Sequence, residues 1–261
     1  MTVSINRYLT ITSKMKKIHI ILLAFTLFFL SACFDTKDEN TWIVGTSADN
    51  PPYEFMQDGE IVGFDIDLIN EIAKTLNKKV ELKNMELHSL LAAVSSKNVD
   101  IVIAGLTPTP EREEKVDFSI PYTSTSIAFL YRGEDNFAEP KDLKGKIVGA
   151  QLGSTWNIIA NDLAEVNDFK VSSLASNLML VEDLKANRID AVVLEDFQTD
   201  KFIEIYPQLA KFTTQDFGST FAVVLPKNSS HKKDIDEAIR ALKSNGTIQT
   251  LSKKWGLIGA E

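Results

Sequence analysis

From about residue 42 onward, short apolar runs alternate with longer amphipathic segments. The runs are rich in Val, Ile and Phe, which favour half-buried extended backbone, and they predict strands at 42–45, 79–82, 101–104, 127–131, 146–149, 191–194 and 221–225. The segments between them repeat apolar residues at helical spacing and predict helices near 65–76, 88–96, 155–165, 177–187 and 230–244. Asp65 is the expected N-cap of the first helix. This alternation predicts an α/β fold with largely parallel sheets.

The predicted strands and helices fall into two sets. The second set opens with a fresh turn and strand at residues 142–149. We expect residues 42–127 and 224–261 to form lobe 1 and residues 128–223 to form lobe 2, joined by two extended crossover strands. This layout places a cleft between the lobes.

The first 32 residues have the pattern of an export signal. A lysine-rich flank precedes residues 18–30, an apolar run that is too short for the roughly 20 residues needed to span a bilayer. Small residues then lead to Cys33, the only cysteine of the chain. This arrangement resembles a bacterial lipoprotein signal, whose cysteine becomes the lipidated first residue of the exported protein.

We therefore expect residues 1–32 to be a lipoprotein signal peptide and the polar residues 33–41 to tether the fold to a bacterial membrane. The expected location is the periplasm or the cell surface. An ordinary signal followed by a free Cys33 is the alternative, and Met15 is an alternative start to Met1.

Composition excludes several classes of protein. Hydrophobic residues make up 44% and charged residues 25%, which is typical of a globular chain and not of a disordered one. The formal charge of −8 disfavours nucleic-acid binding. One cysteine and three scattered histidines cannot build a disulfide framework or a Cys/His zinc site, so we expect no metal and no cofactor.

A series of short motifs spans about residues 42–257 in a characteristic order. They include Gly45-Thr46, Pro51-Pro52-Tyr53-Glu54-Phe55, Gly63-Phe64-Asp65, Glu111-Arg112, Gly153-Ser154-Thr155 and Trp255-Gly256. In this order they resemble the polar-amino-acid-binding proteins of ABC importers. The resemblance implies a two-lobed, periplasmic-binding-protein-like fold of type II and closure around a free amino acid. It also implies an ABC permease and ATPase complex as partner, a monomer and no catalysis.

A buried free amino acid needs a cation for its carboxylate and an anion for its ammonium. Arg112 suits the cation role, because a guanidinium grips a carboxylate through two parallel bonds. A surface arginine among neighbouring glutamates is the alternative. The resemblance places Arg112 at the carboxylate-binding arginine, with Thr107 and the backbone around Ala104 and Gly105 beside it.

The ammonium partner is expected just beyond the strand at 191–194. Glu195 stands where the family usually has aspartate, and Asp196 is its rival because a one-residue shift of the strand end would exchange them. Ser154 and Thr155 follow a glycine at a strand-to-helix turn, where free N–H groups favour an anion. Both can cap the helix and contact the ligand carboxylate.

The specificity pocket departs from the family pattern. Many members stack the ligand side chain between aromatic residues at positions that align here with Asn50 and Leu87. We hypothesise that Trp156, from lobe 2, replaces this stacking surface; its alternative role is packing on its own helix. Tyr53 is expected to pack in the core of lobe 1.

A polar, partly acidic loop lies at the mouth of lobe 1. It contains Ser47, Asp49, Asn50 and Glu54, which could hold a guanidinium, an ammonium or an amide. The loop slightly favours a basic ligand such as arginine or lysine, with glutamine as the main competitor.

Two rival functions use the same scaffold. A cyclohexadienyl-dehydratase-like enzyme would need an acid/base pair, for which Glu195 beside Thr107 and Thr155 is the nearest match. A sensor module for a ligand other than an amino acid would need further domains, and the chain ends at Glu261, soon after the last motif. The sequence therefore favours a stand-alone binding protein.

Overall fold

The computed structural model describes residue 38 and residues 40–257, apart from the side chains of Gln215 and Asp216. The predicted signal peptide, Cys33 and most of the tether lie outside the described residues. The described helices and strands all belong to one compact unit, Asn40–Glu261. Within the described part of the chain, no helix is both long and apolar enough to cross a membrane.

The first sheet belongs to lobe 1 and has the strand order β5-β1-β6-β13-β7. Its strands are β1 (Thr41–Thr46), β5 (Lys79–Asn84), β6 (Ile101–Val102), β7 (Val116–Phe118) and β13 (Val224–Pro226). β1 pairs in parallel with β5 and β6, whereas β13 returns antiparallel to β6 and β7. The last strand of this sheet therefore comes from a part of the chain that follows lobe 2.

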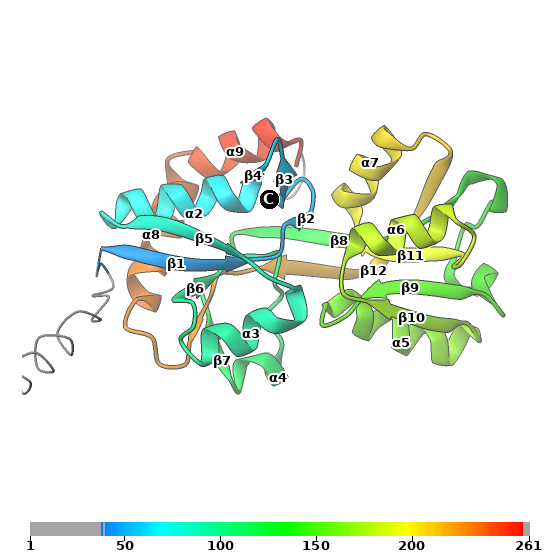
Figure 1. Cartoon of the computed structure of the whole chain (residues 1–261), viewed down its shortest axis with the longest axis horizontal. Coiled ribbons are helices and arrows are strands. Elements are labelled where there is room, and N and C mark those ends of the chain that lie inside the picture. The colour runs from blue at the N-terminus through cyan, green and yellow to red at the C-terminus, as the bar shows by residue number, and fades with distance from the viewer. Residues whose placement is uncertain (1–37, 39, 258–261) are drawn as a thin grey trace, which may run out of the picture. The chain divides into compact units, whose positions relative to one another are not determined.

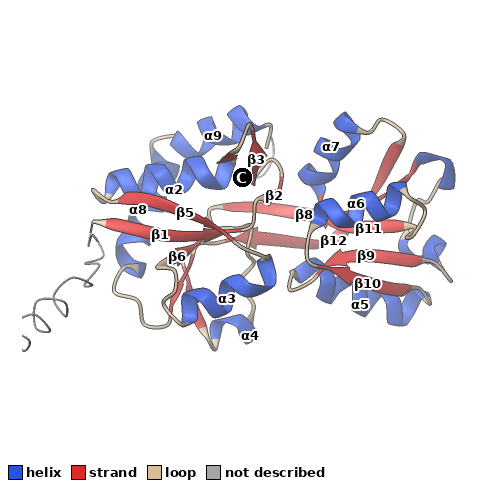
Figure 2. Cartoon of the chain, in the orientation of Figure 1, coloured by secondary structure: helices blue, strands red, loops and turns tan. Residues whose placement is uncertain are grey.

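Helices cover both faces of the first sheet (Figures 1 and 2). α2 (Phe64–Thr75), α8 (Lys232–Ser244) and α9 (Thr247–Trp255) pack together on one face, and α3 (Leu87–Ser95) packs on the other. Because alternate strand residues point to opposite faces, Ile101 and Ile103 join the core beneath α2 while Val102 joins the core beneath α3. A fully buried strand explains the unbroken apolar run at this point of the sequence.

The second sheet belongs to lobe 2 and has the order β10-β9-β11-β8-β12. Its strands are β8 (Thr123–Arg132), β9 (Ile147–Gln151), β10 (Lys170–Leu174), β11 (Ala191–Glu195) and β12 (Leu209–Phe221). β9 is parallel to β10 and β11, and β8 is antiparallel to β11 and β12. α5 (Thr155–Asn167) packs against β9, β10 and β11; the other helices of this lobe are α6 (Asn177–Lys185) and α7 (Asp196–Ile205).

Two long strands connect the lobes. Residues 127–131 of β8 pair with both β11 and β12, whereas residues 123–126 pair with residues 218–221 of β12. The register of β12 shifts between Thr214 and Gly218. This two-stranded section carries the chain from one sheet to the other.

The smaller elements belong to lobe 1 or lie between β8 and β9 in lobe 2. A three-stranded sheet consists of β2 (Asp49–Asn50), β3 (Glu54–Gln57) and β4 (Glu60–Val62). The short helix α4 (Pro110–Glu113) carries Arg112, and two 3-10 turns, η1 (Gly133–Asp135) and η2 (Pro140–Leu143), lie between β8 and β9.

The predicted two-lobed α/β architecture is confirmed, with three local differences. The N-cap prediction for Asp65 is wrong: α2 begins at Phe64 with Gly63 as N-cap, and the Asp65 side chain instead accepts bonds from Gly105 N and Tyr122 Oη. The strand predicted at 221–225 is divided between β12 and β13. Several elements were not predicted: β2, β3, β4, β7, β10, α4, α7, α9 and most of β12.

The lobes meet closely at Gly153, in the turn between β9 and α5. Its φ of +82° favours glycine, and a Cβ built here would lie 2.8 Å from Cα of His88 in α3 of lobe 1. A larger residue at this position would therefore collide with the backbone of the opposite lobe.

We predict that Gly153→Ala forces the lobes apart and raises the radius of gyration measured by small-angle X-ray scattering. Gly145→Ala is the matched control, because Gly145 has a φ of +74° and open space around a built Cβ. An unchanged radius of gyration for the Gly153 variant would contradict the close contact.

Candidate functional site

A cavity with about 400 Å³ of empty space lies between the lobes. Ten residues expected at the site line it: Asn50, Glu54, Leu87, Ala104, Gly105, Thr107, Arg112, Ser154, Thr155 and Trp156. Ser47 and Glu195 do not line it, and Cys33 lies outside the described residues.

Arg112 brings a buried positive charge to the cavity. Its side chain is 8% exposed, and its guanidinium donates to the carbonyls of Thr107 at 2.7 Å and of Gly153, in the opposite lobe, at 2.9 Å. Within the described part of the chain no carboxylate forms an ion pair with it. Burial lowers the pKa of Arg112, although a guanidinium remains charged in proteins. The cavity therefore contains a cation without an anionic partner.

The start of α5 provides hydrogen-bond donors on the lobe 2 side. Ser154 is the N-cap, and its hydroxyl accepts from Asn157 N at 3.0 Å, so its expected capping role is confirmed. The buried Thr155 hydroxyl lines the cavity and has no hydrogen-bond partner within the described residues. A helix N-terminus and a free hydroxyl together suit an anion.

The loop after β6 forms the lobe 1 wall between Ala104 and Thr107. Gly105 has a φ of +54°, and a Cβ here would lie 3.0 Å from Asn50 Nδ2 and 3.2 Å from the Phe221 ring. Glycine therefore lets the loop backbone approach the cavity. Thr107 turns its hydroxyl to Ser219 Oγ at 2.7 Å.

Trp156 and Phe221 supply the aromatic wall. Trp156 is 8% exposed and lies 6.5 Å from Phe221 between ring centroids. Tyr53 is fully buried, as expected, and its ring lies edge-on to Phe221 at 5.1 Å. Trp156 therefore faces the cavity instead of packing only on its own helix.

Glu54 lines the cavity as one member of a buried pair of carboxyl groups. The carboxyl group of Asp65 lies beside it, and both residues are fully buried. Burial raises the pKa of Glu54 well above its usual value, and the charge of Asp65 raises it further. Burial also raises the pKa of Asp65 to about 6, against the hydrogen bonds that Asp65 accepts from Gly105 N and Tyr122 Oη. Asn50 Nδ2 donates to Glu54 Oε1 at 3.1 Å.

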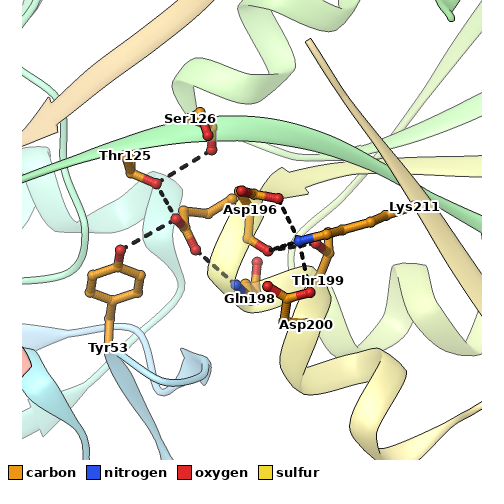
Figure 3. A network of polar contacts seen from close by, with 9 residues as sticks. Tyr53, Thr125, Ser126, Asp196, Gln198, Thr199, Asp200 and Lys211 are labelled. Carbon is orange, nitrogen blue, oxygen red and sulfur yellow. Dashed lines mark hydrogen bonds and ion pairs between the residues drawn. The ribbon is translucent and has the colours of Figure 1, made fainter. Parts of the chain in front are cut away.

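Glu195 joins the lobes through Tyr53 and does not line the cavity. One carboxylate oxygen accepts from Tyr53 Oη at 3.3 Å and from Thr125 Oγ1, and the other caps α7 by accepting from Gln198 N at 2.8 Å. Figure 3 shows Tyr53 and Thr125 converging on this network. Burial raises the pKa of Glu195 to about 7.

Asp196, the rival of Glu195, is engaged elsewhere. Its carboxylate pairs with Lys211 Nζ at 2.6 Å, and Lys211 also pairs with Asp200 at 2.7 Å (Figure 3). This ion-pair network lies between α7 and β12, so Asp196 is already neutralised within lobe 2.

Four lining residues were missed by sequence reasoning: Leu106, Gln151, Asn177 and Phe221. Gln151 and Asn177 contact Asp49 of the mouth loop, whose neighbour Ser47 donates to Asp49 Oδ1 instead of facing the cavity. Gln151 stands two residues before the Gly153-Ser154-Thr155 motif, a position that could have signalled it. Among the described residues, no group of three or more His, Cys, Asp or Glu side chains could hold a metal ion.

Comparison with known proteins identifies this architecture. The sequence pattern that defines the bacterial extracellular solute-binding proteins, family 3, matches residues 42–258. The chain belongs to this family. The arginine-binding extracellular protein ArtP of Bacillus subtilis is 33% identical to this family 3 chain over 250 residues, covering 92% of the chain and 98% of ArtP.

Two solved structures extend the likeness to the fold of family 3. An ancestral arginine-binding protein bound to arginine has a TM-score of 0.80 and 35% identity, covering 84% of this chain and 99% of that one. An ancestral arginine-binding protein bound to glutamine has a TM-score of 0.79 with the same identity and coverage. These values support the two-lobed type II fold.

We predict that Glu195→Gln flattens the pH dependence of stability. In the folded protein the pKa of Glu195 is raised from 4.5 to about 7. The contribution of this group to the free energy of unfolding is therefore fully present below pH 4.5 and is lost as the pH rises through 7. The wild type should lose about 3 kcal/mol of unfolding free energy over this range from this group, and the variant should not.

Chemical denaturation between pH 4.5 and 7.5 measures this loss. The exposed Glu165, changed to Gln, is the control and should keep the wild-type slope because solvent screens its charge. Parallel slopes for wild type and Glu195→Gln would contradict the prediction.

Proposed function

We propose that this chain binds a free basic amino acid, L-arginine first, and delivers it to the permease of an amino-acid ABC importer. The observation that carries the proposal is the buried Arg112 guanidinium, which lines the cavity without a carboxylate partner in the described residues. An uncompensated buried cation is costly, and a ligand carboxylate would neutralise it. Several relatives, ArtP among them, are named as arginine-binding proteins, which supports arginine as the first candidate.

The ligand carboxylate would lie between Arg112 of lobe 1 and Thr155 of lobe 2. Arg112 offers a charged fork, and Thr155 offers a hydroxyl at the start of α5. The backbone of Ala104 and Gly105, together with Thr107 and Ser154, would complete this end of the site. Because these groups come from both lobes, the carboxylate would favour the closed arrangement.

The ligand ammonium would pair with Glu195. Glu195 is buried at the lobe interface, and its oxygen already accepts a bond from Tyr53 of the opposite lobe. An ammonium would replace this weak donor and stabilise the ionised carboxylate. Asp196 is less suitable because Lys211 already neutralises it.

The ligand side chain would meet Trp156, Leu87, Asn50 and Glu54. A guanidinium stacks well on an indole, and a nearby cation would favour the ionised form of Glu54. L-glutamine is the second candidate, because burial favours the uncharged form of Glu54, and the amides of Asn50 and Asn177 also suit a neutral amide. One solved neighbour is described as bound to glutamine.

Function would follow from closure alone, without catalysis. An open cleft would capture the ligand on lobe 1, and contacts from lobe 2 would then shift the population to the closed form that a permease recognises. We propose a monomer with lobe 1 at residues 42–127 and 224–261 and lobe 2 at 128–223. The two separate sheets support these boundaries.

The export and anchoring of the chain complete the proposal. Residues 1–32 would be removed and Cys33 lipidated, holding the protein at the outer face of a bacterial membrane. Residues 34–40 would then tether a fold whose first strand begins at Thr41. The extracellular character of the family supports this location.

The first test is calorimetric titration of residues 34–261, freed of bound amino acid by unfolding and refolding. L-arginine, L-lysine, L-ornithine and L-glutamine are the ligands. Tightest binding of L-arginine supports the proposal, and tightest binding of L-glutamine supports the second candidate. Absence of binding by all twenty amino acids would contradict both.

We predict that Arg112→Ala weakens ligand binding by roughly 100- to 5000-fold, because an unpaired buried charge costs about 3 to 5 kcal/mol. Arg240→Ala is the control, since Arg240 lies exposed on α8. Calorimetry measures both affinities, and a loss below about threefold for Arg112→Ala would contradict its role.

We also predict that Trp156→Ala weakens L-arginine binding by roughly 5- to 30-fold, because a buried cation–π contact contributes about 1 to 2 kcal/mol to binding. Trp156→Phe retains an aromatic face and should lose less. Equal affinities of the wild type and both variants would show that the indole does not stack on the ligand.

A further inference from the structure

Asp49 lies where three elements of lobe 2 approach lobe 1. It begins the short strand β2 and is 8% exposed. Its carboxylate accepts from Asn177 N at 2.7 Å and from Gln151 Nε2 at 3.0 Å, and its backbone carbonyl accepts from Gln198 Nε2 at 3.1 Å. One residue of lobe 1 is thus bonded to β9, α6 and α7 of lobe 2.

The contact with Asn177 caps a helix across the lobe interface. Asn177 is the first residue of α6, and the N-cap Ser176 side chain accepts from Leu178 N, not from Asn177 N. The Asn177 N–H therefore has no acceptor within its own helix. An ionised carboxylate at a helix N-terminus also interacts favourably with the helix dipole.

Hydrogen bonds within lobe 2 hold the Gln151 side chain, the second donor to Asp49, in a fixed orientation. Gln151 Oε1 accepts from Asn177 Nδ2 at 3.1 Å, and Gln151 Nε2 donates to Ala175 O at 3.1 Å as well as to Asp49. Gln151 is 4% and Asn177 3% exposed. Hydrogen bonds within lobe 2 therefore position Gln151 and Asn177, the two residues that donate to the Asp49 carboxylate.

Neutral donors alone satisfy the Asp49 carboxylate. Oδ1 accepts from Ser47 Oγ at 3.2 Å, Oδ2 accepts from Asn177 and Gln151, and within the described residues no Lys or Arg pairs with it. Both oxygens are thus occupied by the protein. The residue also lines the cavity, but its carboxylate oxygens are already bonded to lobe 2 and to Ser47.

We propose that Asp49, Gln151 and Asn177 form an interlobe latch that stabilises the closed arrangement independently of the ligand. Opening the lobes separates Asp49 from all three donors of lobe 2 at once. If the ligand binds tightly only to the closed form, its apparent affinity scales with the closed fraction. Asp49 is therefore a positioning residue that raises affinity for every ligand of the cleft by the same factor.

A distance measurement between the lobes tests the latch without any ligand. Spin labels at Lys83→Cys on β5 and Val166→Cys on α5 report the separation in residues 34–261, which lack Cys33; both positions are exposed. We expect the refolded, ligand-free wild type to populate both a short, closed distance and a longer, open one. Asp49→Ala and Asp49→Asn should lower the closed-to-open ratio by roughly 10-fold or more, the value of a charge-assisted hydrogen bond.

Two further variants serve as controls in the distance measurement. Asp58→Asn removes an exposed carboxylate from the turn between β3 and β4 and should leave the ratio unchanged. Gln151→Ala should lower the ratio, and adding it to Asp49→Ala should lower it little further, because the two residues act through one contact.

Titrations with L-arginine and L-glutamine separate the latch from direct ligand contact. These affinities rest on the proposed function, whereas the ligand-free distances do not. If Asp49 acts as a latch, Asp49→Ala should weaken the binding of both ligands by the same factor. If Asp49 contacts a ligand cation directly, the variant should weaken the binding of L-arginine alone. Unchanged ligand-free distances, or a loss confined to L-arginine, would overturn the proposal.

Discussion

The buried positive charge of Arg112 is the constraint on which the arrangement of the site depends. Its donors already bridge the lobes, because one reaches the Thr107 carbonyl in lobe 1 and another the Gly153 carbonyl in lobe 2. Carbonyl dipoles orient a guanidinium but do not neutralise it. The glycine at 153 is required by the same geometry, since the backbone that receives this bond passes directly against α3.

Closure and ligand capture are separable in this molecule. Arg112 and Thr155 enclose the end of the cavity that suits a carboxylate, whereas Asp49 with Gln151 and Asn177 joins the lobes at another edge. A binding protein with a ligand-independent contact needs less of the ligand's interaction energy to close. The same contact would reduce the difference in closed fraction between the ligand-free and the ligand-bound protein. The free energy that the latch contributes to closure must therefore remain smaller than the free energy that the ligand contributes.

Most of the periodic helices and strands, and the order of the family motifs, could be predicted from the sequence, because both depend on local pattern. The helix α7 and most of β12 were missed. Ten of the twelve residues expected to contact the ligand line one cavity. The short strands β2, β3 and β4 were not predictable, since two to four residues give too little periodicity. Gln151 and Asn177 were missed because their role arises only when lobe 2 meets β2, a contact between residues more than a hundred positions apart.

The acidic mouth loop shows why formal charge in a sequence differs from charge in a fold. Asp49 is directed to the start of α6, and burial beside Asp65 raises the pKa of Glu54 well above its usual value. Both effects weaken the negative charge that the sequence suggested for this loop. A cationic ligand would favour the ionised form of Glu54, whereas a neutral amide would not. Discrimination between arginine and glutamine then depends on the burial of Glu54 and on the stacking surface of Trp156, more than on the number of acidic residues.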